Sequence, residues 1–91
     1  MIAAIFEATM ERAQVERLAA LMREGRPTRP EAVVTAALLV DGDHVQLVAL
    51  WRDRDAFERY RATAPVLRGT ELMRQVGVEP VLRIAEVPEF G

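Results

Sequence analysis

The 91-residue chain contains no cysteine, serine, lysine or asparagine, and all twelve of its basic residues are arginine. Serine and cysteine nucleophiles, lysine Schiff bases and an asparagine oxyanion donor are therefore excluded. The groups left for acid–base chemistry are the carboxylates, the only tyrosine and the only histidine. Covalent catalysis is accordingly not expected. The lack of cysteine rules out a disulfide framework and agrees with a reducing compartment.

The chain also lacks strong net charge and long apolar runs. A formal net charge of −2 creates no field that would attract nucleic acid. The N-terminal apolar run, Ile2–Phe6, is short, and no stretch approaches the roughly 20 residues that a membrane-spanning helix needs. We therefore expect a cytoplasmic protein with no nucleic-acid or membrane partner. Its length is that of one domain, residues 1–91.

Two apolar segments, 32–40 and 45–51, flank Asp41-Gly42, a dipeptide that favours a tight hairpin turn. Side chains alternate between the faces of a strand, so the first segment has two faces to compare. One face holds Val33, Thr35, Ala37 and Leu39, and the other holds Val34, Ala36, Leu38 and Val40. Neither face is strongly polar. An apolar second face predicts a second covering layer, which we expect to be another copy of the chain.

The remaining patterns complete a βαββαβ order. Alternating residues predict further strands at 2–8 and 81–87. Helical spacing predicts a helix over 10–24 with Thr9 as its cap and Gly25 as its stop, and two prolines predict a loop over 25–30. A second helical region opens at the cap Asp53, runs to Ala62, is interrupted by Pro65 and resumes over 66–76 until Gly77. The order predicts a ferredoxin-like α+β fold, a four-stranded antiparallel sheet with helices on one face, dimerising sheet to sheet into an α/β barrel.

Strand periodicity also predicts which side chains share a face. If Trp51 points toward the helices, so do the other odd-numbered residues of 45–51, whereas Val48 and Leu50 face the partner subunit. Glu7 and Arg83 are expected on that partner-facing side as well. Leu50 and Val48 are thus the predicted centre of a homodimer interface.

Residues 45–57 read Val-Gln-Leu-Val-Ala-Leu-Trp-Arg-Asp-Arg-Asp-Ala-Phe. A strand that ends in Trp, a short polar cap and Ala-Phe on the next helix resemble the antibiotic biosynthesis monooxygenase (ABM) domain of the dimeric α/β-barrel superfamily. The resemblance implies a cleft between sheet and helices for a small, apolar, planar ligand, with Trp51 in its lining. Haem-degrading relatives use Asn, Trp and His together. Only Trp51 of that set carries over, so haem degradation is not expected.

The candidate site residues each have a structural alternative. Trp51 could stack on a planar substrate and Tyr60 could donate a proton or a hydrogen bond, but both could instead be core aromatics. Phe6 and Phe57 either line the cleft or build the core between sheet and helices. No catalytic residue is assigned beyond the candidates Trp51 and Tyr60, and no cofactor is expected.

Other titratable groups suggest weaker alternatives. His44 is the default general base, although a turn position favours exposure to solvent. Asp41, Asp43 and His44 lack a fourth ligand from elsewhere, so no metal is expected.

One stretch of arginines could clamp an anionic substrate or form a solvated face through pairs such as Asp55–Arg59 and Glu58–Arg61. These arginines are Arg52, Arg54, Arg59, Arg61 and Arg68.

Two functions remain open from the sequence. One is a cofactor-independent monooxygenase acting on an aromatic or polyketide-type small molecule whose own carbanion reacts with dioxygen. The alternative is a non-catalytic dimeric small-ligand-binding or regulatory module, and an isomerase or cyclase on the same scaffold is a related option. A cavity of about 300 Å³ or more beside Trp51 supports ligand binding, whereas side chains that fill this space would contradict every ligand-based function.

Overall fold

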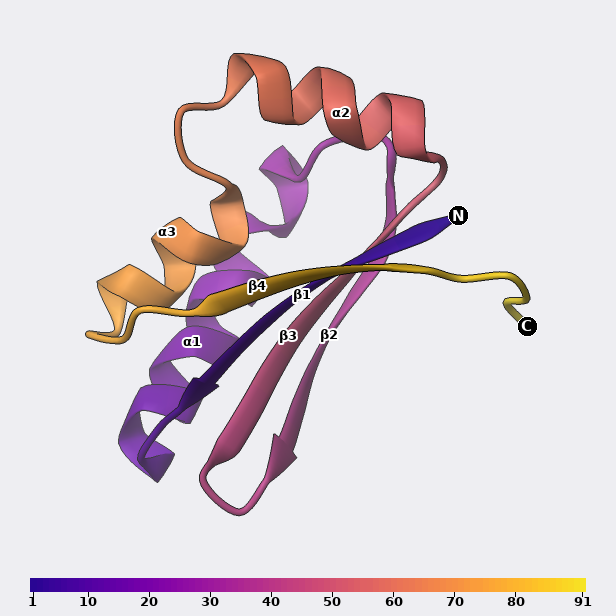
Figure 1. Ribbon diagram of the computed structural model, residues 1–91. Helices are drawn as coiled ribbons and strands as arrows, with labels where there is room; N and C mark the ends of the chain where they lie inside the picture. The colour runs from indigo at the N-terminus through magenta and orange to yellow at the C-terminus, as the bar shows by residue number, and fades with distance from the viewer.

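The computed structural model describes residues 1–91 and confirms the ferredoxin-like βαββαβ order. The sheet is antiparallel with the strand order β2-β3-β1-β4, and the helices lie on one side of it (Figure 1). The strands are β1 (Ile2–Thr9), β2 (Val33–Asp41), β3 (His44–Trp51) and β4 (Val81–Glu86). The helices are α1 (Arg12–Gly25), the 3-10 turn η1 (Arg26–Thr28), α2 (Arg54–Thr63) and α3 (Arg68–Gln75). None of them is both long and apolar enough for a membrane crossing.

The pairing register sets rows of side chains across the helix-facing side of the sheet. Directly paired residues of antiparallel strands share a face. One row crosses all four strands through Leu38, Leu47, Phe6 and Leu82. A second row, near the start of β1, contains Val33, Trp51 and Ile2, all of them buried.

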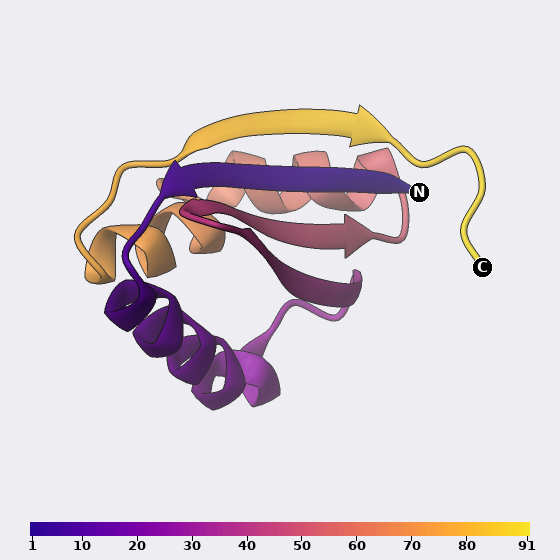
Figure 2. The same cartoon turned by 90° about the horizontal axis from the view of Figure 1, so that it is seen from below.

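The predicted division of β3 between two faces is confirmed. Leu47 and Trp51 are 4% and 5% exposed on the helix side. Val48 and Leu50 pair with Ile5 and Ala3 of β1 on the other face, which no helix covers (Figure 2).

The outer face of the sheet also carries a polar cluster near the hairpin end. Arg83 donates to Glu7 Oε1 at 2.8 Å, and His44 Nε2 lies 3.5 Å from Glu7 Oε2. The hydrogen bond from Arg83 lowers the pKa of Glu7. Glu7 and Arg83 therefore lie on the side opposite the helices, as predicted.

The strict alternation predicted for β2 is wrong at its start. The register shifts between Val33 and Thr35, so Val34 is an unpaired bulge residue and is 45% exposed. A bulge adds one residue to one strand, so the side chains before the bulge point to the face opposite to the one that strict alternation predicts. Val33 consequently turns inward opposite Trp51, while Thr35 pairs with Leu50 on the outer face.

The predicted ends of the first helix are also wrong. Thr9 still pairs with His44 as the last residue of β1, so the chain cannot begin its helix there. The helix begins at Arg12 behind Glu11, whose backbone N–H donates to Gln14 Oε1 at 2.8 Å. Gly25 keeps a helical φ of −83° and does not end the turn. Residues 26–28 continue as η1 because Pro27 occupies a first-turn position, where its missing N–H costs nothing.

The other turn and helix-end predictions are largely confirmed. Gly42 has a φ of 63° in the β2–β3 hairpin, and Gly77 has a φ of 89° just beyond α3. Both values lie in the left-handed region that glycine adopts without a steric penalty. Asp53 caps α2 as expected, whereas α3 begins at Arg68, two residues later than predicted.

The core lies between the sheet and the helices, and Gly69 is one of its tightest points. Phe57, Leu18 and Met73 are the largest fully buried side chains other than those of the sheet. A Cβ at Gly69 would overlap ring carbons of Phe6, which is itself only 3% exposed. The α3 backbone therefore approaches the sheet as closely as it does because residue 69 has no side chain.

We predict that Gly69→Ala destabilises the fold by about 1–3 kcal/mol, because the added methyl group must displace a buried aromatic ring. Urea denaturation measures the difference. Gln75→Ala, an exposed change on the same helix, is the control and should change the free energy of unfolding by less than about 0.5 kcal/mol. Phe6→Leu in the Gly69→Ala background should recover part of the loss. Equal stability of Gly69→Ala and the control would show that this contact is not tight.

Candidate ligand-binding site

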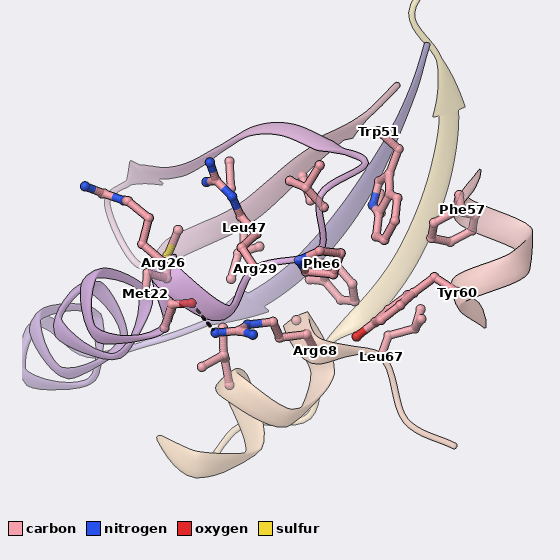
Figure 3. Close-up of a pocket in the computed structure, with 18 residues that line it drawn as sticks. Phe6, Met22, Arg26, Arg29, Leu47, Trp51, Phe57, Tyr60, Leu67 and Arg68 are labelled. Atoms are coloured by element: carbon pink, nitrogen blue, oxygen red, sulfur yellow. Dashed lines mark hydrogen bonds between the residues drawn. The ribbon is translucent and has the colours of Figure 1, made fainter. Parts of the chain in front are cut away.

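A cavity lies between the sheet and the helices beside Trp51 (Figure 3). Twelve of its 18 lining residues are hydrophobic, and the other six are arginines, glycines and a proline. No carboxylate or histidine borders it. Apolar walls with a few polar groups at one side are typical of small-molecule sites.

The cavity volume is about 90 Å³, well below the roughly 300 Å³ that we expected of a ligand pocket. An engineered apolar cavity of about 150 Å³ holds benzene. The space beside Trp51 is thus neither filled nor large enough for a whole aromatic ring system. A ligand with even one ring has to move side chains at the mouth.

A row of alanines explains why the space is there. Ala36, Ala49 and Ala4 are paired across β2, β3 and β1, and all three line the cavity. This row lies between the row that contains Trp51 and the row that contains Phe6. Because alanine ends at Cβ, the larger side chains on both sides rise above it and leave a hollow.

The aromatic residues form one continuous wall of the cavity. The Trp51 ring lies 5.3 Å from the Phe57 ring at an interplanar angle of 73°, and 5.1 Å from the Tyr60 ring at 38°. The contact with Phe57 is edge-to-face, a favoured arrangement of aromatic pairs, and the contact with Tyr60 is tilted. Trp51, Tyr60, Phe6 and Phe57, all predicted from the sequence, border the same cavity. Their action on a ligand stays a prediction.

Two of these aromatic side chains bring polar groups to the cavity. The indole N–H of Trp51 and the hydroxyl of Tyr60 form no hydrogen bond within the chain, yet no fully buried side-chain nitrogen or oxygen lacks a partner. Both groups therefore keep access to open space. Figure 3 shows the Tyr60 hydroxyl directed into the region between Phe6 and Arg68. The cavity can offer a ligand two neutral hydrogen-bonding groups.

Arg68 connects the two sides of the mouth. Its Nη2 donates to the Gly25 carbonyl at 2.7 Å, and its Nη1 donates to the Thr28 carbonyl at 3.3 Å and to Thr28 Oγ1 at 3.2 Å. A side chain at Gly25 would collide with the guanidinium, so glycine permits this close contact. The start of α3 is thereby tied to the end of α1 and to η1.

The structure separates most of the other candidates from the cavity. Exposed His44 lies on the outer face of the sheet and not in the cavity. Of the five arginines that were grouped by sequence, only Arg68 lines the cavity, while Arg52 pairs with Glu31 and Asp53 and Arg61 lies 5.9 Å over the Phe57 ring. The suggested Asp55–Arg59 and Glu58–Arg61 ion pairs do not form. The face of α2 that carries these residues is therefore solvated, but the two expected ion pairs are absent from it.

Sequence reasoning missed Arg26 and Arg29, which also line the cavity. Both were assigned to a loop between a helix and a strand. Their signal in the sequence is weak, because two arginines beside two prolines are ordinary in an exposed turn. The link between distant segments, through the hydrogen bonds from Arg68 to Thr28, becomes visible only in the structure.

Comparison with known proteins was negative by sequence and positive by structure. No family model matches the chain, and no curated protein matches its sequence. Solved structures nevertheless match along almost the whole chain, all at low sequence identity.

SnoaB, a cofactor-independent oxygenase from Streptomyces nogalater, has a TM-score of 0.58 at 20% identity, covering 97% of this chain and 97% of SnoaB. The ActVA-Orf6 monooxygenase of Streptomyces coelicolor, in complex with Nanaomycin D, has a TM-score of 0.63 at 17% identity, covering 97% and 91%. A conserved protein from Methanosarcina mazei Go1 has a TM-score of 0.59 at 8% identity, covering 92% and 89%. The neighbours include ABM-domain proteins, and the chain has their fold, which confirms the predicted resemblance at the level of architecture.

Asp53 positions the helix that carries Phe57 and Tyr60. Its Oδ1 accepts a hydrogen bond from the Ala56 N–H at 2.7 Å. This backbone hydrogen bond holds the pKa of Asp53 below its ordinary value. The ionised carboxylate therefore stabilises the start of α2.

We predict that Asp53→Asn lowers the stability at pH 7 and that its difference from wild type shrinks as the pH falls toward about 2. The lowered folded-state pKa adds stability above the ordinary Asp pKa near 4, and this stability is lost as the folded carboxylate becomes protonated. Urea denaturation at both pH values measures the difference. Asp43→Asn, in the exposed hairpin, is the control. A difference for Asp53→Asn that is the same at both pH values would contradict a charge-dependent cap.

Proposed function

We propose that residues 1–91 act as one cytoplasmic domain that pairs with a second copy and is a cofactor-independent monooxygenase for an aromatic or polyketide-type small molecule. The observation that carries this proposal is the apolar cavity bordered by Trp51 and Tyr60, set between sheet and helices in the ABM fold. Two structural neighbours, an oxygenase and a monooxygenase, support the same reaction class.

The proposed reaction converts an activated CH2 group and dioxygen into a carbonyl group and water. Loss of one proton gives a carbanion, which supplies electrons to dioxygen and forms a carbon–oxygen bond. The resulting peroxide anion takes up a proton to give a hydroperoxide, and loss of the second C–H proton with cleavage of the oxygen–oxygen bond then forms the carbonyl group and releases water. One oxygen atom stays in the product carbonyl, and both hydrogens of the CH2 group end in solvent water. The substrate is the reductant, so the chemistry does not require a flavin or a metal.

The protein's part in this reaction is desolvation and orientation. The rings of Trp51 and Phe57 exclude water from the reacting carbon, and the indole ring of Trp51 provides a surface on which a planar substrate can stack. The Tyr60 hydroxyl, which has no partner within the chain, can donate a hydrogen bond to an oxygen of the substrate on which negative charge develops. A cavity wall that contains no carboxylate or histidine can perform these roles.

The small cavity implies that substrate binding opens the mouth. Two hydrogen bonds of Arg68 join α3 to Thr28 of η1, a third joins it to Gly25 at the end of α1, and all three acceptors are neutral. Arg26 and Arg29 form the outer part of the same rim. The Arg26 and Arg29 side chains form no hydrogen bond within the chain, so their movement enlarges the cavity while Arg68 and the sheet stay in place.

We predict that the protein consumes dioxygen with at least one member of a panel of phenolic and anthrone-like compounds. Tyr60→Phe should lower kcat/KM about tenfold or more through loss of one hydrogen bond to a developing charge. Trp51→Phe should mainly raise KM, since part of the stacking surface is lost. Arg59→Gln, exposed on the same helix, is the matched control. Binding without dioxygen uptake by any compound would favour the non-catalytic binding module instead.

The second copy is proposed to cover the outer face of the sheet. Val48 and Leu50 lie at the middle of this face, and Leu39 and Val81 are 46% and 72% exposed in the single chain. Leu39 and Val81 stand in one row with Gln46 and Glu7, so the apolar area at Val48 and Leu50 has polar residues beside it. An apolar centre with a polar rim is typical of an interface. An isologous pair buries the same surface from both subunits.

We predict a dimer by light scattering at micromolar concentration and a monomer after Leu50→Glu, because the substitution would bury a carboxylate without a matched cation. Ala13→Glu, on the exposed side of α1, adds the same charge elsewhere and should leave the dimer intact. A wild-type monomer, or a Leu50→Glu dimer as tight as the wild type, would refute this interface.

A further inference from the structure

Three arginines border a cavity whose wall is otherwise neutral. Arg26 and Arg29 come from the η1 side, and Arg68 comes from the start of α3 (Figure 3). They are distant in the sequence but border one space. The whole chain carries a formal charge of −2, so this concentration of positive charge runs against the overall balance.

No carboxylate neutralises these three side chains. The ion pairs of the structure use Arg52, Arg74 and Arg83 and leave Arg26, Arg29 and Arg68 without an acidic partner. Glu31, the nearest acid in sequence to Arg29, is fully exposed and has its one ion pair with Arg52. The positive charge at the mouth is therefore available to a ligand.

Arg68 is held in a position to receive an anion. Its two terminal nitrogens donate to neutral oxygens of Gly25 and Thr28, and its Nε–H donates to no atom of the chain. Those neutral acceptors fix the guanidinium without cancelling its charge. A half-buried, fixed guanidinium binds a carboxylate or phenolate more strongly than a mobile surface arginine does.

We infer that the ligand is an aromatic anion, with its ring against Trp51 and Tyr60 and its negatively charged oxygen at the Arg26, Arg29 and Arg68 mouth. The inference rests on the proposed function only in taking the same cavity as the binding site. It adds the charge of the substrate, which neither the sequence pattern nor the fold specifies. Carboxylates and phenolates share this chemistry.

The arginine mouth also bears on the missing general base. The wall has no histidine or carboxylate that could take a proton. Fixed positive charge lowers the free energy of an anionic substrate in the cavity. The substrate can therefore lose its proton to water and bind already ionised. For a phenolate that is conjugated with the reacting carbon, the three arginines thus favour the deprotonated form that supplies electrons to dioxygen.

The test compares two one-ring probes of similar shape, the anion benzoate and the neutral benzamide. Trp51 is the only tryptophan, so its fluorescence reports on the cavity directly. We expect benzoate to bind at least about fivefold more tightly than benzamide at low salt, with the gap closing at high salt. Benzamide that binds as tightly as benzoate would overturn the inference.

Charge variants identify the side chains responsible. Arg68→Gln and Arg29→Gln should each weaken benzoate binding about five- to tenfold and change benzamide binding less than about twofold. Arg68→Lys, which keeps the charge but not the fork of donors, should lie between Arg68→Gln and wild type. Arg17→Gln removes an equal charge from the exposed face of α1 and should change benzoate binding less than about twofold. An equal loss from Arg17→Gln and Arg68→Gln would show only a general charge effect and would reject the site.

The outcomes separate this inference from the proposed function. Dioxygen uptake with equal binding of benzoate and benzamide would leave the monooxygenase in place and reject the anionic ligand. Preference for benzoate without dioxygen uptake would support the anion site in a protein of another activity. No fluorescence change with either probe, in a chain shown to be folded by circular dichroism, would reject the cavity as a site and both proposals with it.

Discussion

The antiparallel register of the two central strands is the constraint on which the rest of the structure depends. Pairing of Ile2 with Trp51 and of Phe6 with Leu47 assigns every second residue of β1 and β3 to the helix side. A slip of one residue would turn β3 over relative to β1, so that Trp51 would move to the outer face and Leu50 would lie under the helices beside Ile2 and Phe6. The core and the cavity would both lose the Trp51 side chain by that one change.

The same register produces the cavity from small residues as much as from large ones. Ala4 and Ala49 lie side by side between a row with Trp51 and a row with Phe6. Gly69 lets α3 come close to Phe6, so the helices close over the alanines without filling the hollow. Arg68, the adjacent residue in the chain, is thereby brought to the rim, where it bonds to Gly25 and Thr28. Fold, hollow and charged mouth follow from one pattern of large and small side chains.

Much of this was predictable because it depends on local periodicity. Strand alternation predicted that Trp51 and Leu50 point to opposite faces of the sheet. The Asp53 cap predicted the start of α2, which carries Phe57 and Tyr60. The bulge at Val34 was not predictable, since it arises from pairing with β3 rather than from any glycine or proline in β2. The start of α1 was missed for a similar reason, because Thr9 remains paired with His44. That Arg29 and Arg68 border the same cavity depends on the hydrogen bonds that join Arg68 to Thr28, which no local pattern encodes.

The central claim is that ligands enter the hollow under the helices and that the other face of the sheet serves assembly. Nitrogen-15 NMR tests it directly, because the single Trp51 gives one indole N–H signal and Gln46 presents a side-chain amide on the outer face. On titration with benzoate the indole signal should shift and saturate while the Gln46 amide stays in place. A shift of the Gln46 amide with an unchanged Trp51 signal would contradict the account.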